Sequence, residues 1–241
     1  MDYSEVFNRE RPVPAITSYD TQVRPLLKWV YAWMGIGLLV TAIIAFFTAT
    51  SPGLLELRTN PIIAIGSFVL MIAFVLGLSW GISRISPSVA ALLFMLYAGL
   101  MGFSLSMVVL FFDLGSIFIA FGTTAVLFGV MSMFGFTTNV DLTQYRNLLF
   151  MALIGLLIAI VLNMFFGGGV FTLIISIVGV IIFMGLTAYD TQNLKRMAVV
   201  LEQEGDAAAL AKYSIFGALS LYLNFINIFI FLLQIMGGNS E

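Results

Sequence analysis

Long apolar blocks separated by short polar connectors dominate the pattern of this sequence. Residues 171–185, FTLIISIVGVIIFMG, form a typical block that contains no charged residue. A helix needs about 20 predominantly apolar residues to cross the roughly 30 Å hydrocarbon core of a bilayer. Segments of this length lie at residues 28–50, 61–83, 88–112, 115–137, 147–166, 169–190 and 213–237.

The pattern predicts that all seven segments are helices. The bilayer core holds no water to satisfy backbone groups, and blocks of about 20 apolar residues do not fit the short alternating strands of a membrane barrel. We therefore expect an all-α integral membrane protein, a seven-helix transmembrane domain over residues 28–237. Residues 1–27 are mostly polar and are expected to form a cytoplasmic tail rather than a cleaved signal peptide, and residues 238–241 a short C-terminal tail.

Composition agrees with a membrane protein and excludes several functions. Hydrophobic residues make up 61% of the chain and charged residues 9%, far from the soluble average. The few basic residues form no face for nucleic acid. The chain has no cysteine and no histidine, which removes thiolate chemistry, the commonest general base and the commonest metal ligand. We expect neither an enzyme nor a bound cofactor.

The basic residues predict the orientation in the membrane. All of them except Arg58 fall on one side of the predicted bundle. Cytoplasmic connectors carry an excess of lysine and arginine, so this side is expected to be cytoplasmic, with the N-terminus inside and the C-terminus outside. The residues on this side are Arg9, Arg11, Arg24, Lys28, Arg84, Arg146, Lys195, Arg196 and Lys212.

Small residues recur at four-residue spacing in the third segment, at Ala98, Gly102 and Ser106, with Gly99 beside them. Small residues let membrane helices approach closely, so the stripe predicts a packing face. Pore lining is the alternative interpretation.

Asp190 follows an apolar block in the stretch LTAYDTQNLKR, with Lys195 and Arg196 just behind it. An ionised carboxylate in mid-bilayer costs about 3 kcal/mol, so acids in membrane helices usually face a bundle interior or water. If the sixth segment begins near Val170, Asp190 lies about 30 Å along the helix, near its cytoplasmic end. A hydrated helix end explains the residue as well as a function does on depth alone.

Two asparagines in the last segment favour a more specific role. Asn224 and Asn227 are three residues apart and share one helix face in an otherwise apolar stretch. Asn224 can approach Asp190 if the sixth segment extends deeper than assumed or the seventh begins later. A hydrogen bond between two membrane helices contributes on the order of 0.6 to 2 kcal/mol, which accounts for the asparagines without any function.

The stretch GLTAYDTQNLKR, followed by SLYLNFINIFIFLL, closely resembles the paired signature of the Bax inhibitor family, also called transmembrane Bax inhibitor motif or lifeguard proteins. The bacterial branch is most similar, and LLFMLYAGLMGFSLS also matches. The resemblance implies a seven-helix bundle with a central helix, located in the plasma (inner) membrane of a bacterium, and a pH-sensitive calcium leak. Family members typically pair two aspartates; Asp190 matches the first, whereas Asn224 stands at the second position.

This departure changes the expected pH response. Two facing carboxylates repel each other and titrate as a coupled pair, whereas an amide donates to an ionised Asp190 or accepts from a protonated one. We therefore expect pH gating to be blunted or displaced. The family's latch, a basic residue, corresponds approximately to Arg84, although a membrane-interface anchor is the alternative for this arginine.

Calcium prefers six to eight oxygen ligands, and this chain offers few. We expect a weak, transient site at Asp190 together with the side-chain carbonyls of Asn224 and Asn227. Asn163 and Asp113 are further candidates for the pore or its outer mouth, although a solvated turn explains Asp113 better.

Other functional classes fit less well. An intramembrane aspartyl protease shares the Tyr189–Asp190 pair but needs a second carboxylate, which Asn224 does not supply. The main alternative is a regulatory protein, acting in stress or protease regulation, that binds another membrane protein without conducting ions. Its interface is expected on small-residue stripes or on residues 197–212, interpreted as a short surface helix, a break near Gly205 and the entry to the last segment.

Overall fold

The structure is a computed structural model that describes residues 16–81, 85–204 and 206–237. These residues form helices and short connectors, with no strand. The helices, in chain order, are α1 Ile16–Thr50, α2 Pro52–Thr59, α3 Pro61–Gly81, α4 Pro87–Phe111, α5 Leu114–Thr137, the 3₁₀ helix η2 Leu142–Tyr145, α6 Arg146–Phe166, α7 Gly169–Glu204 and α8 Ala207–Gly237.

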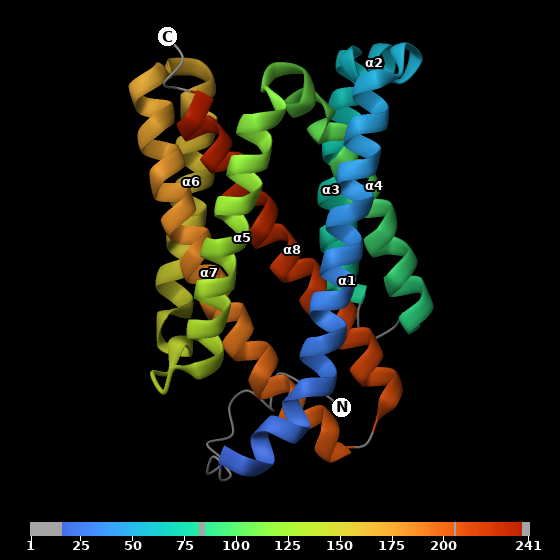
Figure 1. The fold of residues 1–241 in the computed structure, drawn as a ribbon, viewed down its shortest axis with the longest axis vertical. Helices are drawn as coiled ribbons and strands as arrows, with labels where there is room; N and C mark the ends of the chain where they lie inside the picture. Colours follow the sequence, from blue (N-terminus) through green and yellow to red (C-terminus); the bar gives the residue numbers. More distant parts are fainter. Residues whose placement is uncertain (1–15, 82–84, 205, 238–241) are drawn as a thin grey trace.

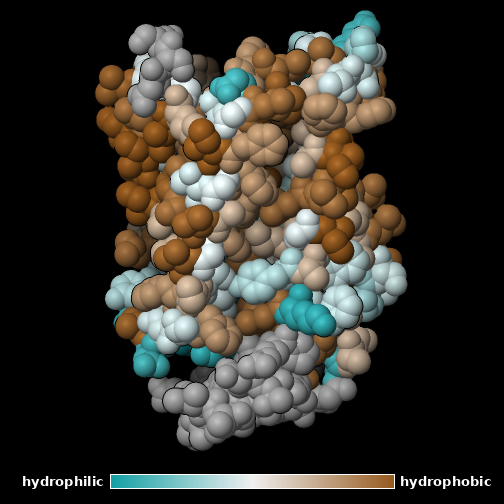
Figure 2. Space-filling view, viewed as in Figure 1, coloured by the Kyte–Doolittle hydropathy of each residue, from teal (hydrophilic) through white to brown (hydrophobic). Residues whose placement is uncertain are grey.

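The seven predicted segments each coincide with one long helix. In the described part of the chain, six helices are long and apolar enough to cross a membrane, and α2 with α3 adds a seventh if this bent pair is one crossing. The all-α membrane bundle expected from the sequence is therefore confirmed. Hydrophobic side chains cover most of the visible face of the bundle, and hydrophilic residues gather towards its two ends (Figure 2).

Helix α8 occupies the centre of the bundle. It runs obliquely between α1, α3 and α4 on one side and α5, α6 and α7 on the other (Figure 1). It contacts α1, α4, α5 and α7. Its most apolar stretch is 67% buried, against 6% for α6, so α8 meets protein on most sides while α6 is exposed on most of its surface.

The two ends of the bundle differ in charge. The start of α1, the connector between α5 and α6, and the turn between α7 and α8 lie at one end, whereas α2 lies at the other (Figure 1). Arg146 begins α6, Lys195 donates to the carbonyl of Phe136 near the end of α5, and Arg196 pairs with Asp141 in the connector, so these residues belong to the first end. Arg58 belongs to α2, at the second. The charge asymmetry deduced from the sequence is thus present in the fold.

Two helices extend beyond the predicted membrane segments. Helix α1 begins at Ile16, although its candidate membrane span begins at Leu26, close to the predicted residue 28, and α7 continues past residue 190 to Glu204. Residues 197–204 belong to α7 rather than to a separate surface helix, and Gly205 lies outside the described residues. The second half of α7 is held in the protein core because its apolar side chains pack against the start of α1; Leu201 of α7 and Leu26 of α1 are both buried.

The small-residue stripe of α4 packs against α1. Ala98, Gly102 and Ser106 are buried, and a Cβ atom on Gly102 would fall 2.5 Å from the carbonyl oxygen of Thr41. Thr41 in turn donates its hydroxyl to the carbonyl of Ala98 at 2.9 Å. The packing interpretation of this stripe is confirmed.

Candidate functional site

Asp190 lies inside α7, at its contact with the central helix. Its carboxylate oxygen Oδ2 accepts hydrogen bonds from the hydroxyl of Ser220 at 2.6 Å and from the side-chain amide of Asn224 at 2.7 Å. Both donors belong to α8 and are four residues apart, so one face of α8 presents them to the same oxygen. The approach of Asn224 to Asp190 expected from the sequence is confirmed.

Apolar packing positions this polar contact. Asp190 and Leu194 are four residues apart on α7 and share a face. Leu194 is 5% exposed and lies in the same core cluster as Leu221 of α8. The two helices are therefore held together by apolar side chains next to the acid, which fixes the distance across which Ser220 and Asn224 reach it.

The donors to Asp190 are neutral. Asp190 is partly buried, whereas Asn224 is 5% exposed. Among the described side chains, one ion pair is found, between Asp141 and Arg196, and it does not involve Asp190. Arg84, the predicted latch, lies outside the residues whose structure is described.

Asn227, a predicted pore-lining residue, does not join this contact. Its amide donates to the carbonyl of Leu223 in its own helix at 2.8 Å. The shared face inferred from the spacing of Asn224 and Asn227 therefore does not bring both side chains to Asp190, because the amide of Asn227 is satisfied by the backbone of its own helix.

The end of α6, which carries Asn163, and the connector between α4 and α5, which carries Asp113, lie at the end of the bundle opposite the start of α1 (Figure 1). Asn163 exchanges hydrogen bonds with Thr172 across the turn between α6 and α7. Asp113 caps α5 by accepting from the backbone of Ser116 at 2.9 Å and from its hydroxyl at 2.5 Å. These hydrogen bonds from Ser116 hold the pKa of Asp113 below its usual value. Both residues thus have local structural roles in helix turns and caps.

A chain of hydroxyl groups runs beside the site. The hydroxyl of Tyr31 on α1 pairs with that of Ser132 on α5, which lies 3.1 Å from the hydroxyl of Thr191 on α7. Thr191 donates to the carbonyl of Thr187. Tyr31 and Ser132 also line an open, mostly apolar hollow of about 430 Å³ between α1 and α5. Polar groups therefore lead from this hollow to α7, one residue from Asp190.

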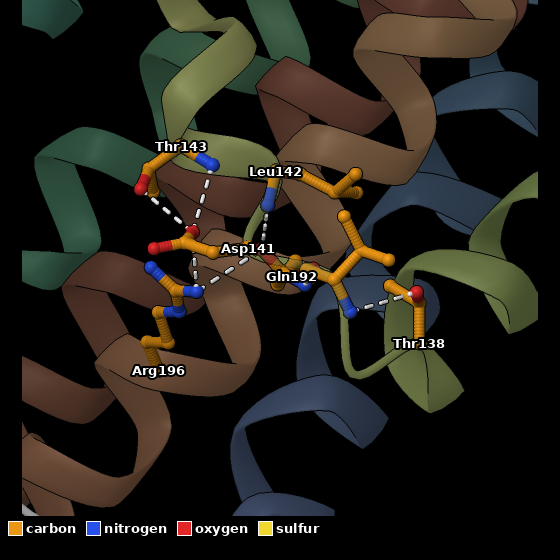
Figure 3. Close-up of polar contacts among 7 residues, drawn as sticks. Thr138, Asp141, Leu142, Thr143, Gln192 and Arg196 are labelled. Carbon is orange, nitrogen blue, oxygen red and sulfur yellow. Dashed lines mark hydrogen bonds and ion pairs between the residues drawn. The ribbon is translucent and has the colours of Figure 1, made fainter.

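A second polar cluster holds the connector between α5 and α6 against α7 (Figure 3). The amide of Gln192 donates to the carbonyl of Val140 and accepts from the backbone N–H of Leu142, both at 2.8 Å. Arg196 donates to Asp141 at 2.6 Å and to Gln192 at 3.2 Å. We call Asp141, Gln192 and Arg196 the connector clamp.

The connector clamp shapes the electrostatics of this end of the bundle. Hydrogen bonds from Thr143 and then from Arg196 lower the pKa of Asp141 to about 2. Asp141 therefore stays ionised at any physiological pH. Because the clamp joins α7 two residues after Asp190, it fixes the connector relative to the site without contributing a group that titrates near neutrality.

Sequence reasoning missed Ser220 and Gln192. Ser220 precedes Asn224 by four residues, so helical spacing contained the signal, but a serine in an apolar helix more often bonds to its own backbone. Gln192 follows the predicted end of the sixth segment at residue 190, so the sequence offers no reason to expect it in the core. Its 5% exposure reflects the continuation of α7 and its two backbone partners.

Comparisons with known proteins agree with this fold. The family model described as inhibitor of apoptosis-promoting Bax1 matches residues 23–241. Inner membrane protein YbhL of Escherichia coli is 44% identical over 210 residues, which cover 87% of this chain and 89% of that protein. Uncharacterized proteins of Deinococcus radiodurans and Borreliella burgdorferi are 40% and 37% identical, covering 94% and 88% of this chain and 96% and 90% of their own lengths. The chain belongs to the Bax inhibitor family.

Proposed function

We propose that this protein is a slow cation leak, with calcium as its ion, in which the contact of Asp190 with α8 holds the pathway closed. The observation that carries the proposal is the carboxylate of Asp190 bound by Ser220 and Asn224 where α7 meets the central helix. An acid kept within an apolar helix at such cost usually serves an ion or proton pathway.

The donor set supports a closed state. Ser220 and Asn224 occupy Oδ2 of Asp190 with an O–H and an N–H, which are groups that a cation must displace. Calcium requires oxygen ligands. Rotation of the Asn224 amide would present its carbonyl oxygen in place of the N–H, and the Ser220 hydroxyl accepts as well as donates. Keeping the α7–α8 contact and binding a cation are thus alternatives at one carboxylate.

Weak binding suits a leak. Within the described part of the chain, no three carboxylate, histidine or cysteine side chains gather around one point. Asp190 therefore offers a single negative charge, supplemented by neutral oxygens and water, so a cation is held briefly and released. In this proposal calcium is the transported ion and not a resident cofactor.

The amide at position 224 is proposed to blunt the pH response. A second carboxylate there would share a proton with Asp190 and couple the α7–α8 contact to pH. Asn224 does not titrate, so the contact has one titrating partner instead of two. The Asn224→Asp variant is expected to gain a pH dependence of flux that this chain lacks or shows at a different pH.

Calcium flux into liposomes that contain only the purified protein and lipid tests these statements. We expect a measurable leak for this chain, a lower leak for Asp190→Asn, and a steeper pH profile for Asn224→Asp. Equal flux in protein-containing and empty liposomes would overturn the leak. Identical pH profiles for this chain and Asn224→Asp would overturn the role of the pair.

The same assay separates conduction from regulation of another membrane protein. A leak pathway conducts in pure lipid, whereas an adaptor has an effect only together with its partner. Burial of Ala198, Val199 and Leu201 in the protein core leaves this part of the segment 197–212 a poorer docking surface than the sequence suggested.

A further inference from the structure

Arg58 carries an unsatisfied buried donor. Among the described side chains, its Nε is the buried nitrogen or oxygen atom that lacks a hydrogen-bond partner. A buried donor without a partner costs about 1 to 3 kcal/mol, and more when it belongs to a charged group. Arg58 as a residue is partly exposed, so the missing partner can come from outside the protein.

The rest of the guanidinium is weakly held. Nη2 donates to the carbonyl of Ser104 in α4 at 3.4 Å, a long hydrogen bond. Glu56 is the one acidic residue between positions 26 and 112. It is exposed and two residues from Arg58, a spacing at which helix side chains do not face each other. Asp113, at the same end of the bundle, accepts hydrogen bonds from Ser116, and among the described side chains no ion pair involves Arg58.

The surroundings of Arg58 have the features of a membrane interface. Helix α2 has no buried residue and meets α3 at a bend of 79°. It lies at one end of the bundle (Figure 1). Leu57 of α2 and Ile62 at the start of α3 are 48% and 81% exposed. A short helix that crosses the end of a bundle with exposed apolar residues lies where lipid headgroups meet acyl chains.

A phosphate group supplies what Arg58 lacks. The planar guanidinium presents its N–H groups as a fork that matches two oxygens of a phosphate, and such charge-assisted bonds are about twice as strong as neutral ones. We propose that Arg58 binds the phosphate of a membrane phospholipid, with the acyl chains of that lipid lying on the exposed side chains of Leu57 and Ile62. This inference does not depend on the proposed leak.

Native mass spectrometry of the detergent-purified protein, titrated with phosphatidylglycerol, measures the binding of the first lipid. We expect Arg58→Gln to weaken it about tenfold, the loss of one charge-assisted pair. Arg58→Lys is expected to weaken it less, because the charge remains and the fork is lost. Glu56→Gln is the matched control on the same helix and should not weaken binding.

Two further ligands identify the source of the phosphate. Diacylglycerol with the same acyl chains lacks the phosphate and is expected not to bind, and inorganic phosphate at millimolar concentration is expected not to displace the lipid. Equal affinity in this chain and Arg58→Gln, or equal binding of diacylglycerol, overturns the proposal. Displacement of the lipid by inorganic phosphate would show a free-anion site and overturn the lipid assignment. Arg58→Lys decides the matter should Arg58→Gln fail to fold.

Discussion

Gly135 of α5 lies directly against the backbone of Ala188 in α7, so closely that a Cβ atom on Gly135 would overlap the Ala188 carbonyl group. This approach brings α5 to α7 two residues before Asp190. It also sets the separation across which Ser132 of α5 reaches Thr191 of α7 at 3.1 Å. The close backbone approach at Gly135 therefore sets the separation of α5 and α7 beside the site.

Substitution of Gly135 is expected to separate these helices. Gly135→Ala adds one methyl group against backbone that cannot rotate away, and overpacking of this kind costs about 1 to 3 kcal/mol. The melting temperature of the detergent-solubilised protein should fall. Gly122→Ala is the control, because Gly122 lies on the same helix with no neighbouring atom within 4 Å of its Cβ position. Equal melting temperatures for the two variants would contradict the close approach.

Ser220→Ala removes one of the two donors to Asp190. A hydrogen bond to a charged group contributes about 1.5 to 3 kcal/mol, so the α7–α8 contact should weaken. If that contact holds the leak closed, flux in liposomes should rise by about tenfold or more at neutral pH. Ser214→Ala is the matched control, because Ser214 is buried in the same helix and donates to the carbonyl of Leu210. A rise in both variants, or in neither, contradicts the role of Ser220.

The ion pair of Asp141 and Arg196 should stabilise the protein at neutral pH and lose this effect in acid. The folded-state pKa of Asp141, about 2, lies below the ordinary value of 3.8, so its contribution is complete above about pH 4 and disappears as pH falls towards 2. Both side chains are exposed, so the pair contributes at most about 1 kcal/mol.

Asp141→Asn isolates this charge effect, because the asparagine oxygen can still accept from the backbone N–H of Thr143. The melting temperature should be slightly lower than that of the unsubstituted chain at pH 7, and the difference should shrink as pH falls below 4 and vanish below about pH 2. Asp141→Ala also removes the cap and should lower it further at both pH values. A difference for Asp141→Asn that persists at low pH would contradict an electrostatic origin.

The number and position of the membrane helices were predictable because the apolar blocks are long and uninterrupted. The end of α7 was not predictable, because Thr191 and Gln192 are polar residues of the kind that usually occur at a solvated helix end. Their burial depends on partners far away in sequence, the hydroxyl of Ser132 and the backbone of Val140 and Leu142. Long-range contacts of this kind leave no periodic signal in the segment itself.

The site was predictable in part, for a related reason. Asp190 and Asn224 each stand out in an apolar helix, so pairing them requires only that their helices be neighbours. Asn163 and Asn227 stand out equally, but each bonds within its own turn or helix. Composition identifies polar residues that need partners in a membrane, whereas the choice between a local and a distant partner depends on the rotation of each helix.

The absence of cysteine allows a direct test of the proposed orientation. Gln144→Cys and Gly168→Cys place single thiols just before and just after α6, at exposed positions. With the basic end of the bundle in the cytoplasm, a membrane-impermeant maleimide applied to intact spheroplasts should label Gly168→Cys and should reach Gln144→Cys only after permeabilisation. The reverse pattern would invert the topology, and labelling of both without permeabilisation would show that α6 does not cross the membrane.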